Sequence, residues 1–405
     1  MAVASILLAA ALAQSPAPRP PEPGTIVVTG RRIPDYRAAL EACLARSCPT
    51  DEDATATLAL AEALFVAGEY RDARTALRGS LGRNRDQAAR YPEPVSDLYR
   101  ANARVARHLG MDNDAHHSTR QILRALQAGL AVEDHRHFTA RLEIAQSMFA
   151  FGQYEQAIRS LRDLVERARA AGRDDVVAMA ELRLLWVSYV QTPHGGARDR
   201  LVEMSQSPDP YRSHGAKRLL IRIYSEYGDI QRADALIAEL GRNSPRRQLL
   251  YSPPYELAER DNVGRSTDRQ EQVIEASIGG RSSLLTSNHA DRMVGNFEDK
   301  RIDVGFWVRP DGRVEDVEIV RQSSEASWAP PLLQSIRGRR YAPAAAATYR
   351  LERYTLTSGI EHRVTGTHIP YRTARARVEY YDLGETVPPS PAPSNGPAAQ
   401  QDNIH

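Results

Sequence analysis

Alternating apolar and polar residues mark a strand pair near the C-terminal end of the chain. Four apolar residues from Ile302 to Val308 alternate with Asp303, Gly305 and Trp307, the period of two that indicates a half-buried strand. Pro310-Asp311-Gly312 follows, and proline and glycine supply the backbone angles of a tight turn. A second alternating run covers 314–320. The pattern predicts an antiparallel hairpin.

A short helix and two further strands are predicted after this hairpin. Pro330-Pro331 is tolerated only in the first turn of a helix. The next three apolar residues form one stripe, and Gly338 ends the helix. Alternation returns at Tyr349–Thr357 and again at 374–381. These elements predict a small α+β domain over 296–384.

Between 36 and 245 the apolar spacing becomes helical and recurs. Gly68-x-Tyr70-x-x-Ala73 returns as Gly152-x-Tyr154-x-x-Ala157, and further turn glycines are expected at Gly110, Gly195 and Gly228. The steps between the five glycines are 42, 42, 43 and 33 residues. The pattern resembles tetratricopeptide-type repeats with longer helices. It implies a curved solenoid with a concave binding face; a helical bundle without a groove is the alternative.

The α+β segment carries short motifs in a recognisable order. They are Asp311-Gly312, Ser323-Ser324 and Arg340-Tyr341-Ala342-Pro343-Ala344. With the hairpin, helix and strand between them, Asn296–Leu383 resembles the C-terminal domain of TonB-type energy transducers. The resemblance implies a domain that binds an extended segment as an added strand. An unrelated α+β domain is the alternative. The predicted fold class is therefore α+β multidomain, a tetratricopeptide-like solenoid followed by a small TonB-C-like domain.

A second resemblance lies near the N-terminus. The β-branched run Thr25, Ile26, Val27, Val28, Thr29 is a strong short strand and resembles the TonB box of TonB-dependent receptors. Gly24 replaces the usual acidic residue, and no receptor barrel follows. The resemblance implies that this segment is donated as a strand; an ordinary strand is the alternative.

Candidate partner-binding residues follow from this idea of strand addition. Tyr349–Thr357 and Val378–Tyr381 are the expected acceptor edges, with Trp307 as a nearby reporter. The residues expected to line the first edge are Tyr349, Leu351, Tyr354 and Leu356.

The N-terminal region indicates export. An apolar run ends in the small-x-small signature Ala11-Leu12-Ala13, which predicts a signal peptide at 1–13 and a periplasmic protein. No basic residue precedes the run, so a retained short anchor is the alternative. Cys43 and Cys48 are compatible with a disulfide, provided that the helix breaks between them, as Pro49 favours.

Composition delimits the remaining segments. A proline-rich linker is expected at 14–35, a connecting segment at 246–295 and a disordered tail at 385–405. The formal net charge is only +2, which gives no electrostatic case for nucleic acid. Of the 53 basic residues, only Lys217 and Lys300 are lysine.

Catalytic and metal-binding signatures are absent from the sequence. It contains no Walker loop, GxGxxG, HExxH or GxSxG motif. The pairs His116-His117 and His135-x-His137 do not share a helix face. Arginine runs at 337–340 and 372–377 could meet carboxylates or phosphates. No enzyme activity, cofactor or metal is therefore expected.

These patterns favour a non-enzymatic, periplasmic protein–protein interaction protein of the cell envelope, related to TonB-type transducers. Its expected partners are proteins or peptides, among them outer-membrane receptors or the protein itself. Two alternatives stay open: an energy transducer for outer-membrane import, and an envelope enzyme without recognisable motifs.

Overall fold

The computed structural model describes residues 32–240, 248–255, 257, 300–364 and 370–386, and the side chains of all these except 358–375, 385 and 386. The predicted export signal and the Thr25–Thr29 segment lie outside the described residues. Of the predicted linker only residues 32–35 are described, and Ile33–Asp35 already belong to α1; of the predicted tail only Glu385 and Thr386 are described, and they end β6.

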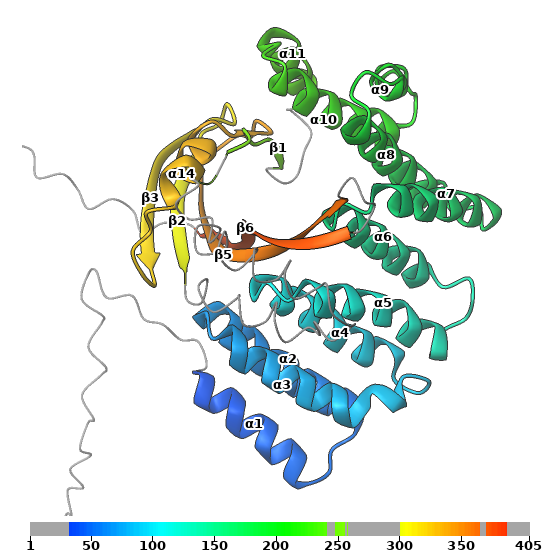
Figure 1. Ribbon diagram of the computed structural model, residues 1–405, viewed down its shortest axis with the longest axis vertical. Coiled ribbons are helices and arrows are strands. Elements are labelled where there is room, and N and C mark those ends of the chain that lie inside the picture. The colour runs from blue at the N-terminus through cyan, green and yellow to red at the C-terminus, as the bar shows by residue number, and fades with distance from the viewer. Residues whose placement is uncertain (1–31, 241–247, 256, 258–299, 365–369, 387–405) are drawn as a thin grey trace, which may run out of the picture.

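Helices α1 to α11 follow one another along an arc (Figure 1). Sequential helices pack antiparallel, and alternate helices such as α2 and α4 also touch, so each helix pair stacks on the next. This is the tetratricopeptide-like helical solenoid that the repeats predicted. The helices are α1 (Ile33–Ala45), α2 (Thr50–Ala67), α3 (Tyr70–Asn84), α4 (Pro92–His108), α5 (Asp112–Gly129), α6 (His135–Ala150), α7 (Tyr154–Ala170), α8 (Asp174–Gln191), α9 (Ala197–Ser205), α10 (Pro210–Glu226) and α11 (Ile230–Leu240).

Four of the expected turn glycines close the helix pairs. Gly68, Gly110, Gly152 and Gly228 have φ of 85°, 69°, 70° and 76°, a left-handed conformation that costs glycine no steric strain. Gly195 also lies in the predicted position, in the loop between α8 and α9, but this loop is wider and Gly195 is not left-handed. The sequence reading missed a left-handed turn glycine between α7 and α8, Gly172.

Small residues let the paired helices approach. Ala73, Ala115, Ala157 and Ala233 each stand five residues after a turn glycine and are at most 2% exposed. Larger side chains here would overpack the core and force the helices apart. The repeat is therefore encoded by a glycine at the turn and an alanine in the contact.

The C-terminal part is a four-stranded antiparallel sheet in the order β3-β2-β5-β6. Its strands are β2 (Arg301–Val308), β3 (Val314–Gln322), β5 (Thr348–Val364) and β6 (Pro370–Thr386). Helix α14 (Ala329–Arg337) begins with its prolines, ends at Gly338, and covers one sheet face. The core between them is built mainly from the apolar face of β2, with Trp328, Leu332, Ile336, Tyr354 and Leu356.

The sheet order corrects one prediction. Tyr349–Thr357 belongs to β5, which pairs with β2 on one side and β6 on the other. It is an interior stretch and cannot accept another strand, so the expectation for this edge was wrong. Strand β6 pairs along the whole of β5 and covers its second edge. The alternation of residues within β5 could not reveal this pairing, because the alternation is the same in an edge strand and in an interior strand.

The connecting segment contributes a strand that was not predicted. Strand β1 (Leu249–Tyr251) pairs antiparallel with β4 (Arg340–Tyr341) in a separate two-stranded sheet. Its length of three residues is too short for a periodic signal. Near the other end, Cys43 and Cys48 form a disulfide across the break between α1 and α2, where Pro49 caps α2.

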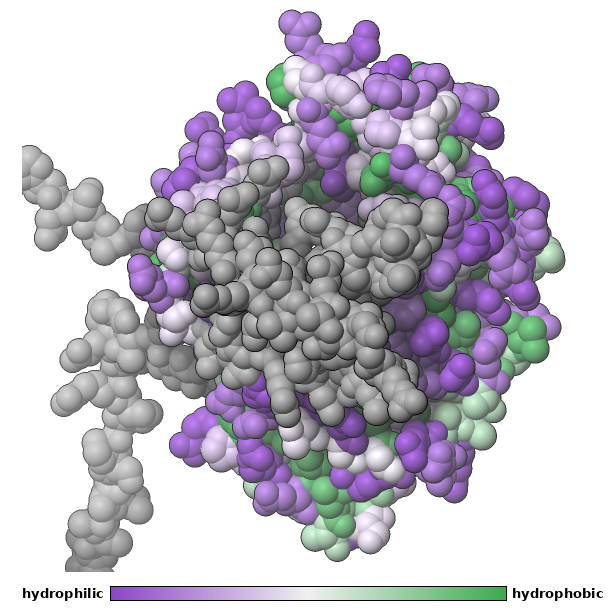
Figure 2. Space-filling view, viewed as in Figure 1, coloured by the Kyte–Doolittle hydropathy of each residue, from purple (hydrophilic) through white to green (hydrophobic). Residues whose placement is uncertain are grey.

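The sheet lies inside the arc of the solenoid, and β5 and β6 run across its opening (Figure 1). On the face seen in Figure 2, polar and charged residues dominate the described surface, and hydrophobic residues form scattered small groups.

Candidate functional site

The face of the sheet opposite α14 docks on the solenoid at α2 to α5. Side chains alternate along a strand, and on β5 the odd-numbered Arg353 and Thr355 face the helices. Arg377 and Tyr381 do the same from β6. We call the contact between these four residues and the helices the joint.

Arginines in the joint donate to carbonyls at helix ends. Arg353 Nη1 lies 3.1 Å from Phe65 O and also bonds Val66 O, both in the last turn of α2. Arg377 Nη2 lies 3.1 Å from Arg107 O in the last turn of α4. The last carbonyls of a helix lack intrahelical donors and carry its partial negative charge. Each guanidinium satisfies and neutralises such an end.

Each of the two arginines also forms an ion pair with a carboxylate. Arg353 forms a two-pronged pair with Asp303 at 2.6 and 2.9 Å, and Arg377 lies 2.7 Å from Asp112. The two carboxylates are buried. A buried charge needs both a partner and hydrogen bonds. Arg353 supplies both to Asp303, and Arg377 supplies an ion pair to Asp112.

An aromatic cluster fills the space between the two arginines. Phe65 contacts Tyr70, His108 and Tyr381 with ring centroids 4.8 to 5.0 Å apart. Thr355 Oγ1 lies 2.9 Å from Tyr70 Oη and 3.1 Å from His108 Nδ1. Burial, and then the charge of Arg107 and other arginines, lowers the pKa of His108 to about 3, so the joint contains a neutral imidazole.

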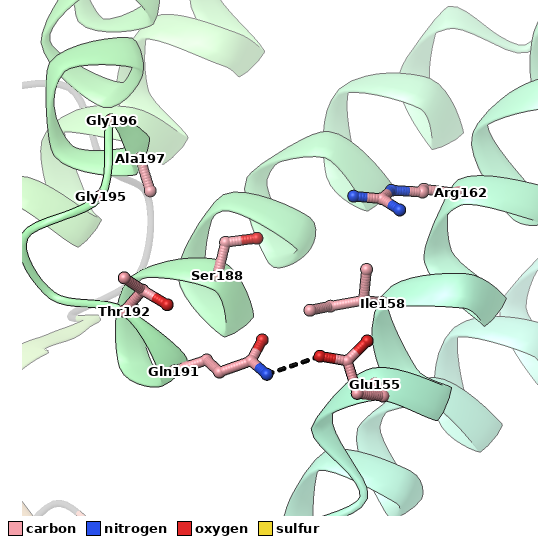
Figure 3. A pocket seen from close by; sticks show the side chains of 9 residues that line it. All are labelled: Glu155, Ile158, Arg162, Ser188, Gln191, Thr192, Gly195, Gly196 and Ala197. Atoms are coloured by element: carbon pink, nitrogen blue, oxygen red, sulfur yellow. Dashed lines mark hydrogen bonds between the residues drawn. The ribbon is translucent and has the colours of Figure 1, made fainter.

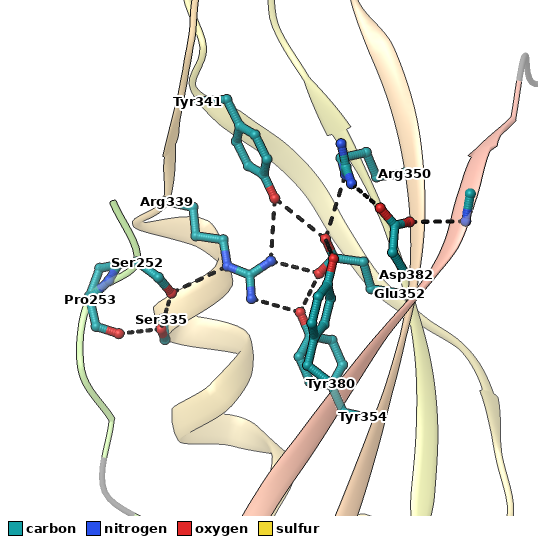
Figure 4. A network of polar contacts seen from close by, with 11 residues as sticks. Ser252, Pro253, Ser335, Arg339, Tyr341, Arg350, Glu352, Tyr354, Tyr380 and Asp382 are labelled. Carbon is teal, nitrogen blue, oxygen red and sulfur yellow. Dashed lines mark hydrogen bonds and ion pairs between the residues drawn. The ribbon is translucent and has the colours of Figure 1, made fainter. Parts of the chain in front are cut away.

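A second polar network lies on the α14 side of the sheet (Figure 4). Arg339 donates from Nη1 to Glu352 Oε2 at 2.6 Å and from Nη2 to Tyr354 Oη at 2.7 Å. Burial, and then the charge of Glu352, raises the pKa of Tyr341 to about 12. The tyrosines therefore stay neutral donors. This network ties the end of α14 to the sheet.

The two arginine runs seen in the sequence each supply an arginine to one of these contacts: the run at 372–377 to the joint, and the run at 337–340 to the network of Figure 4. Arg377 meets the carboxylate of Asp112, and Arg339 meets that of Glu352. The sequence showed that these arginines could meet carboxylates, but their partners lie far away along the chain. Phe65, His108 and Asp112 were missed, because each occupies an ordinary helix end.

The two outer strands of the sheet differ. Strand β3 has two register shifts against β2 and a non-glycine residue with positive φ, Asp316, features that blunt an edge against further pairing. Strand β6 has one irregularity, opposite Leu351/Glu352. Val378–Tyr381, the second expected acceptor, lies on β6, and no described strand pairs with its outer side.

The other predicted binding residues lie inside the fold. Trp307 and Tyr349 are half-buried and contact each other at 5.5 Å on the solenoid-facing side of the sheet. Leu351 is half-buried on β5, and Tyr354 and Leu356 are buried in the core. None of these five reaches a strand edge.

One pocket of about 270 Å³ lies between α7 and the end of α8 (Figure 3). Glu155 faces Gln191 across it, and their side chains are hydrogen bonded at 2.6 Å. The remaining lining residues are Ile158, Arg162, Ser188, Thr192, Gly195, Gly196 and Ala197. Its walls are mostly polar.

No family model and no curated protein matches this chain. Solved helical-repeat structures align with part of it. BtubC (BKLC) from P. vanneervenii has 17% identity and TM-score 0.38, over 51% of this chain and 87% of that one. A kinesin light chain with nearly identical TPR-like repeats from Podosopora anserina has 15% identity and a TM-score of 0.35, over 52% of this chain and 94% of that one. The apo form of RapI has 15% identity and a TM-score of 0.40, over 64% of this chain and 67% of that one.

Within the described ranges, no helix is both long and apolar enough to cross a membrane.

Proposed function

We propose that this protein is a non-enzymatic protein–protein interaction protein of the cell envelope. It accepts an extended segment of its partner along the outer edge of β6. The observation that carries the proposal is the position of β6, which is the last strand of the sheet and lies inside the solenoid arc.

Strand addition suits this edge because β6 is fixed on both faces. Its odd-numbered residues Arg377 and Tyr381 contact the solenoid, while Asp382 on the other side pairs with Arg350. Backbone donors and acceptors along a fixed strand give affinity, and the alternate side chains give specificity. A rigid acceptor also reduces the ordering entropy of binding.

The order hairpin, helix, strand in β2, β3, α14 and β5 supports the resemblance to TonB C-terminal domains. On that resemblance, the donated strand is a TonB-box-like segment. Thr25–Thr29 of the protein itself is one such segment, and an outer-membrane receptor would supply another. Participation in TonB-dependent transport is the narrower form of the proposal.

A peptide titration tests strand addition. The chain from residue 32 to 405, which keeps every described residue, is titrated with a labelled peptide of residues 24–33, and binding is followed by fluorescence anisotropy. Hydrogen exchange then locates the bound peptide. We expect saturable binding, with new protection of the backbone at 376–384.

The control is the same peptide with Val27→Pro, which removes a backbone donor and should bind at least tenfold more weakly. Absence of binding at millimolar peptide, or protection confined to β3, contradicts the proposal.

A further inference from the structure

Three consecutive segments of the solenoid meet around the pocket of Figure 3. One wall is a face of α7, with Glu155, Ile158 and Arg162 at positions i, i+3 and i+7, a spacing that places all three side chains on one side of a helix. The opposite wall is the end of α8, and residues 195–197 before and at the start of α9 close the pocket. Its volume of about 270 Å³ lies at the small end of ligand pockets, so it suits a small molecule.

The α7 wall carries opposite charges at its two ends. Glu155 and Arg162 are separated by two helix turns, a rise of about 10 Å. Gln191 Nε2 donates to Glu155 Oε1 at 2.6 Å and holds this carboxylate at the pocket wall. Within the described part of the chain, Arg162 has no ion-pair or hydrogen-bond partner. The two charges therefore border the same space without being paired to each other.

An apolar floor and two hydroxyl groups lie between these charges. Ile158 stands between Glu155 and Arg162 on α7 and is only 7% exposed. Ser188 and Thr192 project from the opposite wall, with Ser188 towards the Arg162 end (Figure 3). Neither hydroxyl forms a hydrogen bond with another of the described residues. The pocket thus offers a ligand an anion, a cation, hydroxyl groups and an apolar contact.

A glycine leaves space in the third wall. Gly196 has φ of −64° and ψ of 6°, a backbone conformation that residues with side chains also adopt. A Cβ there would meet no heavy atom within 4 Å, whereas a Cβ at Gly195 would lie 3.1 Å from Thr192 O. Neither the backbone nor the packing therefore requires glycine at 196. A side chain at this position would occupy pocket space that a ligand needs.

We infer that this pocket binds a free α-amino acid with an uncharged side chain. The carboxylate of the ligand pairs with Arg162 and accepts a hydrogen bond from Ser188. Its ammonium group pairs with Glu155, and its side chain packs on Ile158 beside Gly196. The protein would then carry a small-molecule site on the solenoid in addition to its contact with a partner protein.

A dipolar ligand fits this arrangement better than a singly charged one. A plain anion attracted by Arg162 would be repelled by Glu155, and a plain cation would meet the reverse. A molecule with both charges satisfies both ends of the α7 wall, and the charge-assisted hydrogen bonds at each end are the strong kind. The small volume and the apolar floor favour an amino acid whose side chain adds no third charge.

The test uses the full chain and the standard amino acids, each titrated alone near neutral pH by isothermal titration calorimetry. We expect saturable binding of at least one amino acid with an uncharged side chain. The N-acetyl derivative and the amide of that amino acid each lack one charge and should bind at least tenfold more weakly.

Variants of the pocket locate the bound amino acid. Glu155→Gln and Arg162→Gln should each weaken binding by at least tenfold, and Gly196→Leu should abolish it by filling the pocket. Circular dichroism verifies that these variants keep their helices. Arg159→Gln, at an exposed position of α7 that does not line the pocket, is the control and should leave the affinity unchanged.

Two results would overturn the inference. The first is an absence of saturable binding by every uncharged amino acid at millimolar concentration. The second is binding that Gly196→Leu and the double variant Glu155→Gln, Arg162→Gln both retain, which would place the ligand elsewhere. All residues that line the pocket belong to the solenoid, and the inference does not rest on strand addition at β6, so failure here leaves the proposed function standing.

Discussion

At the scale of single residues, Arg353 links three parts of the molecule. It pairs with Asp303 on the neighbouring strand and bonds the carbonyls of Phe65 and Val66 on α2. Its side chain is 4% exposed and that of Asp303 is 3% exposed. Low local dielectric strengthens such a pair and makes it costly to break.

We predict that Arg353→Met destabilises the protein by about 3–5 kcal/mol, because it leaves the Asp303 carboxylate buried without its main partner. Urea unfolding followed by circular dichroism measures the change. Arg321→Met is the matched control: Arg321 pairs with the same carboxylate, but its side chain is 62% exposed, so about 1 kcal/mol or less is expected. Equal losses in the two variants would contradict the prediction.

His108 should make stability depend on pH. Burial lowers its pKa from 6.5 to about 3 in the folded protein, so the unfolded chain binds the proton more tightly. The free energy of unfolding that depends on neutral His108 is fully present above pH 6.5. It is lost as the pH falls towards 3, by at most about 1.4 kcal/mol per pH unit.

Urea midpoints between pH 4 and 7 measure this effect. We expect His108→Gln to flatten the slope in that window, whereas His117→Gln, at an exposed position on α5, should leave it unchanged. An unaltered slope in His108→Gln would show that other groups cause the dependence.

At the scale of elements, two positive-φ glycines with different surroundings serve different purposes. Gly152 has φ of 70° and open space where a Cβ would stand. Gly312, in the β2–β3 turn, has φ of 84°, and a Cβ there would lie 2.0 Å from Tyr341 O. The first glycine is needed for backbone conformation alone. The second also admits the close approach of β4, and Tyr341 N–H donates to Gly312 O.

We therefore expect Gly152→Ala to lower the free energy of unfolding by about 1–2 kcal/mol, because an L-residue in the left-handed conformation carries a steric cost of this size. Gly312→Ala should lower it clearly more. Thermal unfolding of the two variants provides the comparison. A loss for Gly312→Ala no larger than that for Gly152→Ala would mean that β4 moves aside easily.

At the scale of the whole molecule, the joint couples two cores that are far apart in sequence. Tyr381 of the sheet packs against the core of the first helices, and its hydroxyl bonds Glu62. An interface of this kind, with buried ion pairs and aromatic contacts, makes the two parts unfold together.

We predict one cooperative unfolding transition for the wild-type chain and two for the combined variant Phe65→Ala, Arg377→Ala, Tyr381→Ala. Differential scanning calorimetry distinguishes the cases, and small-angle scattering should show a larger radius of gyration in the variant. Val320→Ala, at an exposed position of β3, is the control and should keep a single transition. Two transitions in the wild type would show that the joint is weak.

The sequence by itself determined the local elements. Glycine, alanine and aromatic spacing predicted the helix pairs, and period-two alternation with Pro310-Asp311-Gly312 predicted the β2–β3 hairpin and the strands after it. These signals are local because the steric limits on turns and the burial of one face act over a few residues.

Only the tertiary structure decided which edge stays open and where the sheet docks. Tyr349–Thr357 is interior because β6 pairs with it, and Arg353 and Arg377 find their acceptors on α2, α4 and α5. A strand's alternation is the same at the edge and in the centre of a sheet. Several of the acceptors are backbone carbonyls, which every residue carries, so the residue types in the sequence do not show where these acceptors lie.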